Sequence, residues 1–221
     1  MARKTHSSPE IAKNAILDAA EALMVDVGPA GLRISAVAKK AGMAHPNIIH
    51  HFGSREGLIN ALAERVGQRA TERITRAIDD ALRAPPEERV NAITRVLETS
   101  YHGDEGRSAV WLHLSGAESS LRSNMEQIVT LSHEFRKSMD PTASKENTNR
   151  LVMLVTLALV GEVVSGSSIK EALGFGTDES ERAHFKQWLA EILLNLRDHQ
   201  LDTSLSASHT SNEIDNDGKK S

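Results

Sequence analysis

Apolar residues recur along almost the whole chain with the spacing of an α-helix. The clearest pattern lies near the C-terminus, where six apolar side chains share one helical face at i, i+3, i+4, i+7, i+8 and i+11: Phe185, Trp188, Leu189, Ile192, Leu193 and Leu196. Similar patterns predict helices at about 10–27, 34–41, 45–52, 54–82, 87–101, 107–118, 121–139, 145–169 and 179–200. No stretch alternates apolar and polar residues between turn signals as a strand would, and aromatic residues make up only 3% of the chain. The sequence therefore predicts an all-α fold.

Proline and glycine mark the ends of several of these predicted helices. Gly28-Pro29 is expected to end the first long helix, and Pro85-Pro86 to break the chain before the next group. Beyond residue 201 the apolar content is too low for a packed core, so residues 202–221 are expected to be disordered. Residues 1–9 are expected to form a flexible arm.

Composition restricts the class of protein. The 221 residues include no cysteine, which excludes disulfides and thiolate chemistry and makes a reducing cytoplasm the expected compartment. The first residues are positively charged but lack the apolar core of a secretory signal. The most apolar stretch, LVMLVTLALVG at 151–161, has about half of the roughly 20 residues that span a bilayer. It therefore predicts a buried helix, and no membrane partner is expected.

The formal net charge of −4 is unevenly distributed. Residues 1–65 carry eight Lys or Arg and six Asp or Glu, a balance of +2, whereas the remainder carries eighteen and twenty-four, a balance of −6. A mildly basic first part on an acidic body is compatible with one module that faces DNA and one that does not.

The stretch AKKAGMAHPNIIHHFGSREG at 38–57 joins two short helical patterns through an Ala-Gly-Met step. Ala38 supplies the small residue that lets two helices cross, and Gly42 tolerates the positive φ of a tight turn. Ile48 and Phe52 lie four residues apart on one face of the second helix, and the opposite face carries His45, Asn47, His50 and His51. A short helix with one anchored and one hydrogen-bonding face suits a DNA major groove, which is about 12 Å wide.

The longer stretch GLRISAVAKKAGMAHPNIIHHFGSREGLINAL at 31–62 closely resembles the N-terminal DNA-binding domain of TetR-type transcriptional repressors. The resemblance covers roughly residues 10–65. It implies a helix-turn-helix DNA-binding domain at 10–53 and a helical effector-binding and dimerisation domain at 54–201. Residues 34–41 would be the supporting helix and 44–51 the recognition helix of a homodimer that reads a palindromic operator in double-stranded DNA. It also implies an unknown small-molecule effector and no cofactor or enzymatic activity.

Nine residues are expected to contact DNA. Asn47 and His45 can hydrogen-bond base edges, and the ring of Pro46 can meet a thymine methyl group. His50 and Arg55 are expected at phosphates, and Ser54 is expected to cap the next helix, whose first amides also suit a phosphate. The full set is Arg33, Ser35, Ala44, His45, Pro46, Asn47, His50, Ser54 and Arg55.

Three residues depart from the usual family pattern. Arg33 stands where the family usually has a capping Ser or Thr, with Ser35 two residues further on. Loss of a good cap costs about 1 kcal/mol, although Arg33 could itself reach a phosphate. Ala44 stands where Ser usually begins the recognition helix, and Ile49 replaces the usual Tyr, which removes one hydroxyl contact.

The resemblance also assigns residues to the second domain. The expected effector pocket comprises Trp111, His113, Met125, Phe135 and Met153, each with core packing as the alternative. The expected dimer interface comprises Leu157, Val164, Phe185, Trp188, Leu189, Ile192, Leu193 and Leu196. SAVWLHLSGAESS at 108–120 and the Ile48-Ile49 pair resemble the choline-responsive branch of the family. The helix at 54–82 would transmit the effector's influence, because it belongs to both domains.

Other chemistry finds little support in the sequence. The ten histidines show neither H-x₃-H nor HExxH spacing, so no metal site is predicted. The nucleophile and nucleotide motifs G-x-S-x-G, G-x-G-x-x-G and the Walker loop are absent. The alternative hypothesis is an all-α small-molecule-binding protein or enzyme in which residues 34–52 form a structural corner.

Overall fold

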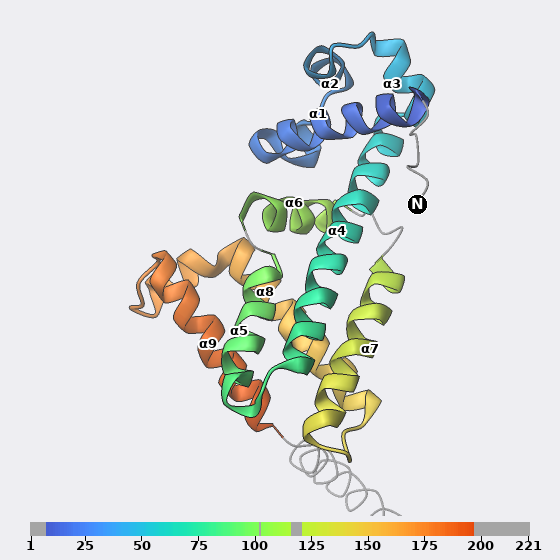
Figure 1. Ribbon diagram of the computed structural model, residues 1–221. Coiled ribbons are helices and arrows are strands. Elements are labelled where there is room, and N and C mark those ends of the chain that lie inside the picture. The colour runs from blue at the N-terminus through green and yellow to red at the C-terminus, as the bar shows by residue number, and fades with distance from the viewer. Residues whose placement is uncertain (1–7, 102, 116–120, 197–221) are drawn as a thin grey trace, which may run out of the picture. The chain divides into compact units, whose positions relative to one another are not determined.

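The computed structural model describes residues 8–101, 103–115 and 121–196 (Figure 1). The regular secondary structure in these ranges is helical throughout, which confirms the all-α prediction. The helices are α1 (Ser8–Gly31), α2 (Ile34–Ala41), α3 (His45–Phe52), α4 (Arg55–Arg83), the 3₁₀ turn η1 (Pro86–Glu88), α5 (Arg89–Thr99), α6 (Gly103–Leu114), α7 (Leu121–Met139), α8 (Lys145–Ala172) and α9 (Glu179–Asn195). The predicted tail at 202–221, most of the predicted arm and the side chain of His113 lie outside the described residues.

Helix boundaries differ from the predicted ones at a few places. At Gly28 the backbone leaves the helical region, with φ 64° and ψ 173°, and Pro29–Gly31 then form one more turn at an angle to the rest of α1. The predicted stop is therefore a kink. α6 begins at Gly103 rather than at 107, and α9 ends at Asn195 rather than at 200.

The chain divides into two compact units. Among the described residues, unit 1 comprises 8–73 and those between 100 and 126, and unit 2 comprises 74–99 and 127–196. This division differs from the predicted domains, which placed all residues from 54 to 201 together. The first part of α4 and the whole of α6 belong with the DNA-binding helices.

The core of unit 1 forms where α1, α2, α3, the first turns of α4 and α6 meet (Figure 1). Its fully buried side chains come from all five helices: Ile16 and Met24 from α1, Val37 from α2, Ile48 from α3, Leu58 and Leu62 from α4, and Leu112 from α6. On α1, Ile11 is 59% exposed, whereas Ile16, Leu17, Ala20 and Met24 are buried.

In unit 2, α5 packs against α9, and a buried polar cluster joins the end of α7 to the start of α8. The Thr148 hydroxyl donates to the Ser144 carbonyl at 2.9 Å and accepts from Arg136 Nη1 at 2.8 Å. It also lies 3.0 Å from Nδ1 of His133. Ser144 Oγ accepts from the Asn147 amide at 3.1 Å and caps α8.

The middle of α8 is apolar, yet most of it is not buried within unit 2. Met153, Leu154, Leu157 and Val164 are between 51% and 63% exposed, while Leu151 and Leu159 are buried. The expectation of a buried helix at 151–161 is therefore wrong for the single chain. By length and hydropathy alone α8 could cross a membrane, and it is the one such helix in the described part of the chain.

Candidate nucleic-acid interface

The turn between α2 and α3 has the geometry of a helix-turn-helix. Gly42 ends α2 in the left-handed conformation, with φ 67° and ψ 28°. The amide of Met43 then donates to the carbonyl of Ala38 at 2.9 Å. Nothing lies within 4 Å of the place where a Cβ would stand on Gly42, so the glycine is required by its positive φ rather than by space. Ala38 is 5% exposed and packs into the core of unit 1.

α3 has one buried face and one exposed face. Ile48 is completely buried and Phe52 packs partly against the same core, beneath the ammonium group of Lys13, which lies 5.9 Å from the ring centroid. The exposed residues at the helix start and on the helix are Ala44, His45, Pro46, Asn47, Ile49 and His50. Polar side chains are thus presented to solvent by a helix that is anchored from behind.

The first turns of α2 and α3 lack a side-chain cap. Arg33 is the N-cap residue of α2 and Ala44 that of α3, both with extended backbone and neither with a capping hydrogen bond from its side chain. Arg33 and Ser35 are exposed at the start of α2. Both residues are therefore available for contacts outside the chain.

α4 begins differently. The amide of Gly57 donates to Ser54 Oγ at 3.0 Å, so Ser54 caps the helix. The carboxylate of Glu56 accepts hydrogen bonds from its own backbone amide and from Ser54, and these contacts lower its pKa from the ordinary value. The first turn of α4 therefore carries a negative charge, which suits the positive end of a helix dipole.

Arg55 makes contacts that the sequence did not predict. Its Nε donates to the carbonyl of Leu32 at 2.8 Å, and its Nη2 donates to the carbonyls of Pro29 at 2.5 Å and Ala30 at 3.0 Å. Its Nη1 lies 3.8 Å from the Glu56 carboxylate. The guanidinium that was expected at a phosphate is thus turned toward the carbonyl end of α1.

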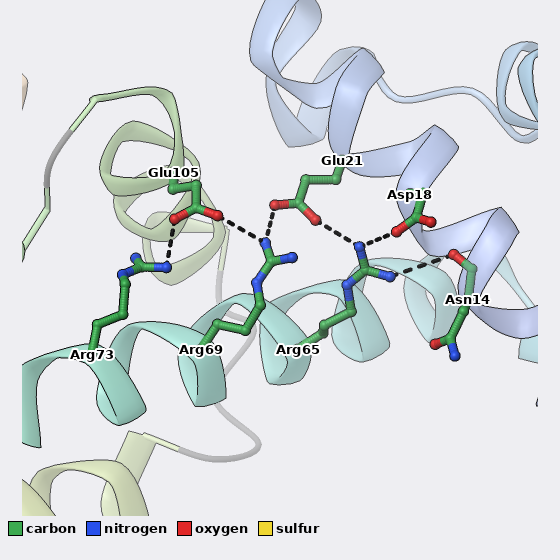
Figure 2. Close-up of polar contacts among 7 residues, drawn as sticks. All are labelled: Asn14, Asp18, Glu21, Arg65, Arg69, Arg73 and Glu105. Atoms are coloured by element: carbon green, nitrogen blue, oxygen red, sulfur yellow. Dashed lines mark hydrogen bonds and ion pairs between the residues drawn. The ribbon is translucent and has the colours of Figure 1, made fainter. Parts of the chain in front are cut away.

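A row of alternating charges runs along α4 and joins it to α1 and α6 (Figure 2). We call this row the ion-pair ladder; its members are Asp18 and Glu21 on α1, Arg65, Arg69 and Arg73 on α4, and Glu105 on α6. The side chains of Glu21 and Arg65 are the least exposed, at 17% and 20%.

Two carboxylates of the ion-pair ladder each contact two arginines. Glu21 accepts from Arg65 at 3.0 Å and also from Arg69, and Glu105 lies 3.3 Å from Arg69 and 2.5 Å from Arg73. Asp18 and the carbonyl of Asn14 complete the partners of Arg65. The arginines recur every four residues on α4, a spacing visible in the sequence, but their acidic partners lie on other helices.

The residues predicted for an effector pocket do not gather within one unit. Trp111 and Met125 belong to unit 1, whereas Phe135 and Met153 belong to unit 2. A Cβ added at Gly28 would stand 3.5 Å from the ring of Trp111, so this ring lies over the kink of α1. Phe135 is 6% exposed in the core of unit 2, and Met153 is 58% exposed on α8.

The residues predicted for a dimer interface fall into two groups. Leu157, Val164 and Trp188 are exposed. Phe185, Ile192, Leu193 and Leu196 are partly buried, and Phe185 lies beneath the ammonium group of Lys170 at 5.7 Å. Leu189 is only 6% exposed, because α9 turns this residue into unit 2, and we correct its assignment to a core residue.

Known proteins resemble this chain in sequence and in fold. Residues 16–62 match the model of the family described as bacterial regulatory proteins, tetR family. An uncharacterized HTH-type transcriptional regulator of Mycobacterium tuberculosis strain H37Rv is 31% identical over 158 residues, which cover 68% of this chain and 76% of that protein.

Solved structures resemble the chain over most of its length. A candidate TetR-family regulator from Mesorhizobium loti MAFF303099 superposes with a TM-score of 0.63 at 12% identity, covering 86% of this chain and 98% of that one. The multidrug binding protein EbrR, complexed with imidazole, superposes with a TM-score of 0.58 at 17% identity, covering 84% and 96%. The family match and the Mycobacterium relative overturn the alternative in which residues 34–52 are a structural corner of an all-α small-molecule-binding protein or enzyme. The chain is a DNA-binding transcriptional regulator, and it belongs to the TetR family.

Proposed function

We propose that this regulator is a homodimeric repressor that reads a palindromic operator and responds to a small-molecule effector. The observation that carries the proposal is the two-sided α3, in which the fully buried Ile48 stands opposite the exposed His45 and Asn47. A helix anchored in this way can enter a major groove without losing its own packing. Such a repressor would act in the cytoplasm, where the DNA is.

The proposed base contacts come from the first turns of α3. Asn47 can hydrogen-bond adenine through both of its amide atoms, His45 can donate or accept, and Pro46 can touch a thymine methyl group. Ala44, at the N-cap, is small enough to let the backbone approach the DNA. These residues would supply the sequence specificity of the regulator.

The proposed phosphate contacts surround these base contacts. Arg33 and Ser35 are exposed at the start of α2, and His50 is exposed on the outer face of α3. Ser54 stands at the start of α4, where backbone amides also suit an anion. Arg55 is left out of this set, because its guanidinium already binds three carbonyls of the same chain.

A second copy of the chain is the proposed partner of the exposed apolar face of α8 and α9. We call this surface the apolar face; its exposed members are Met153, Leu154, Leu157 and Val164 on α8 and Trp188 on α9. Large apolar side chains left exposed on two helices of the same unit indicate a binding surface. The two recognition helices of such a two-fold dimer would read successive major grooves of a palindromic operator, about 34 Å apart. We favour this occupant over a membrane, because the chain is a DNA-binding regulator.

The effector would act by favouring one spacing of the two DNA-binding domains. α4 is the proposed lever, since its residues 55–73 belong to unit 1 and its residues 74–83 to unit 2. The ion-pair ladder supports this role, because it ties α4 to α1 and α6. The complex of EbrR with imidazole supports an effector, because that protein shares the fold. The resemblance to the choline-responsive branch stays a prediction.

The experiment is a gel shift of the purified chain against the DNA upstream of its own gene and against a scrambled duplex, at two salt concentrations. Specific binding should weaken steeply with salt, because phosphate contacts release counterions. Asn47→Ala should weaken specific binding about tenfold or more and leave non-specific binding nearly unchanged.

Asn60→Ala is the matched control, because Asn60 is an exposed asparagine on α4 outside the recognition helix. It should leave both kinds of binding unchanged. Equal reductions of specific and non-specific binding in Asn47→Ala would remove Asn47 from the base contacts, and salt-insensitive binding would contradict the DNA-binding surface itself.

A further inference from the structure

Arg55 occupies a position that is unfavourable for a cation unless something else holds it. It is the first residue of α4, where the helix dipole is positive. Its guanidinium reaches back to the carbonyls of Pro29, Ala30 and Leu32, at the end of α1 and in the link to α2. The last carbonyls of a helix have no partner within the helix and carry its negative end. The charge of Arg55 is therefore satisfied at the end of another helix.

These three carbonyls and Arg55 lie on either side of the helix-turn-helix. The chain passes Leu32 just before α2 begins at Ile34, and it reaches Arg55 just after α3 ends at Phe52. The two ends of the segment that reads DNA are thus joined by one side chain. A planar guanidinium can span several acceptors at once, which a lysine ammonium cannot do from a single nitrogen.

The exit from α3 lies close against the same turn of α4. A Cβ at Gly57 would stand 2.0 Å from the carbonyl oxygen of Phe52, so only glycine allows this approach. The amide of Gly57 is also the group that Ser54 caps. The first turn of α4 therefore holds the entry to α2 through Arg55, and Gly57 leaves room for the exit of α3 to lie close against it.

We propose that Arg55 is a positioning residue that fixes the orientation of α2 and α3 on α4, and that it does not bind a DNA phosphate. The Glu56 carboxylate, 3.8 Å from Arg55 Nη1, is a further partner of this guanidinium within the chain. The inference rests on the proposed reading of DNA by α3. Loss of Arg55 would misalign the base-reading side chains and would leave the number of phosphate contacts unchanged.

The first arm of the test uses the free full-length protein. Hydrogen exchange is compared in the wild type, Arg55→Lys and Arg55→Ala. Both variants should exchange faster over residues 29–37, and Arg55→Lys supplies the same measurement if Arg55→Ala does not fold. Unchanged exchange in a folded variant would overturn the positioning role, whether or not the protein binds DNA.

The second arm uses a duplex that the wild type selects from a random-sequence pool and a scrambled duplex of equal length. Both Arg55 variants should bind the selected duplex about tenfold or more weakly than the wild type, with a non-specific affinity within about twofold of the wild type. The dependence of affinity on salt should be unchanged.

Arg33→Ala is the matched control for a phosphate contact, because Arg33 is exposed at the start of α2. The Arg33→Ala variant should bind both duplexes more weakly by the same factor. The magnitude of the slope of log affinity against log salt should fall by about 0.9 for each phosphate that the protein no longer neutralises. The proposal would be overturned if Arg55→Ala also bound both duplexes equally weakly with a smaller salt slope, and if Arg55→Lys bound both with wild-type affinity. If the wild type selects no duplex, the proposed function fails and the exchange arm still decides the role of Arg55.

Discussion

Arg33 and Ser54 occupy equivalent positions, each just before a helix of the DNA-binding part, and differ in what their side chains do there. Ser54 Oγ accepts a hydrogen bond from the first turn of α4, whereas Arg33 makes no capping bond to α2. The first turn of α2 thus depends on its buried residues, Ile34 and Val37, to hold its conformation. The side-chain cap that α2 lacks is thus present at the start of α4.

We predict that Ser54→Ala lowers the free energy of unfolding by about 1 kcal/mol, because it removes the side-chain acceptor of the Gly57 amide. Urea denaturation of the full chain measures this change. Ser35→Ala is the matched control, since Ser35 is exposed in the first turn of α2, and its effect should stay within about 0.5 kcal/mol. Equal effects of the two substitutions would show that the Ser54 cap contributes no stability.

At the scale of elements, α4 is joined to its neighbours by charge as well as by apolar packing. Leu58 and Leu62 of α4 are fully buried in the core of unit 1, and the ion-pair ladder continues along the helix toward Arg73. Its rungs differ in exposure: Glu21 is 17% exposed and Glu105 is 45% exposed. Since solvent screens exposed pairs, the rungs between α1 and α4 should contribute more than those between α6 and α4.

We predict that Glu21→Gln lowers the free energy of unfolding more than Glu105→Gln does. Loss of the Glu21 charge leaves the half-buried Arg65 and Arg69 with fewer acceptors and should cost about 1.5–3 kcal/mol. Glu105→Gln should cost up to about 1 kcal/mol. Urea denaturation at low and high salt measures both changes.

Asp104→Asn is the control for this series, because Asp104 pairs only with Arg107 on its own helix among the described contacts. An exposed pair at this spacing contributes about 0.3 kcal/mol. If Glu105→Gln destabilised the protein as much as Glu21→Gln, solvent exposure would not determine how much each ion pair contributes to stability.

At the scale of the whole molecule, the apolar face is the feature that a single chain does not account for. Leu157 is 63% exposed and Trp188 is 56% exposed, although both residues belong to helices that are held in place by buried contacts. The pair of Lys170 and Glu162, 3.0 Å apart, links two turns of α8 near Arg182 of α9. We infer that a second copy would meet this surface without a rearrangement of these ion pairs.

We predict that Leu157→Lys converts the proposed dimer into a monomer, because two buried ammonium groups would face each other across the two-fold axis. Sedimentation velocity at micromolar concentration measures the mass. Ile11→Lys is the matched control, since Ile11 is an apolar residue of similar exposure, 59%, on α1, and its association should be unchanged. A wild-type chain that sediments as a monomer would contradict the dimer.

The local features of this protein could be predicted from the sequence. A helical period follows from the repeat of apolar residues about every 3.6 positions, so the helices at 34–41, 45–52 and 121–139 were predicted with the bounds that the structure has. The turn at Gly42 could be predicted from two local features, the small Ala38 and a glycine that tolerates positive φ. Each of these signals depends on neighbours within one or two turns.

Contacts between distant parts of the chain required the tertiary structure. The sequence indicated that Arg55 is a cation beside a DNA-reading helix, and a phosphate was the natural partner to predict for it. Its acceptors lie 23 to 26 residues away, and only the packing of α4 against the end of α1 brings them within reach. The ion-pair ladder likewise needs three helices side by side (Figure 2). The apolar period predicts that a segment is helical, whereas its buried face and the partner of a long, flexible charged side chain are decided by what the folded chain places near it.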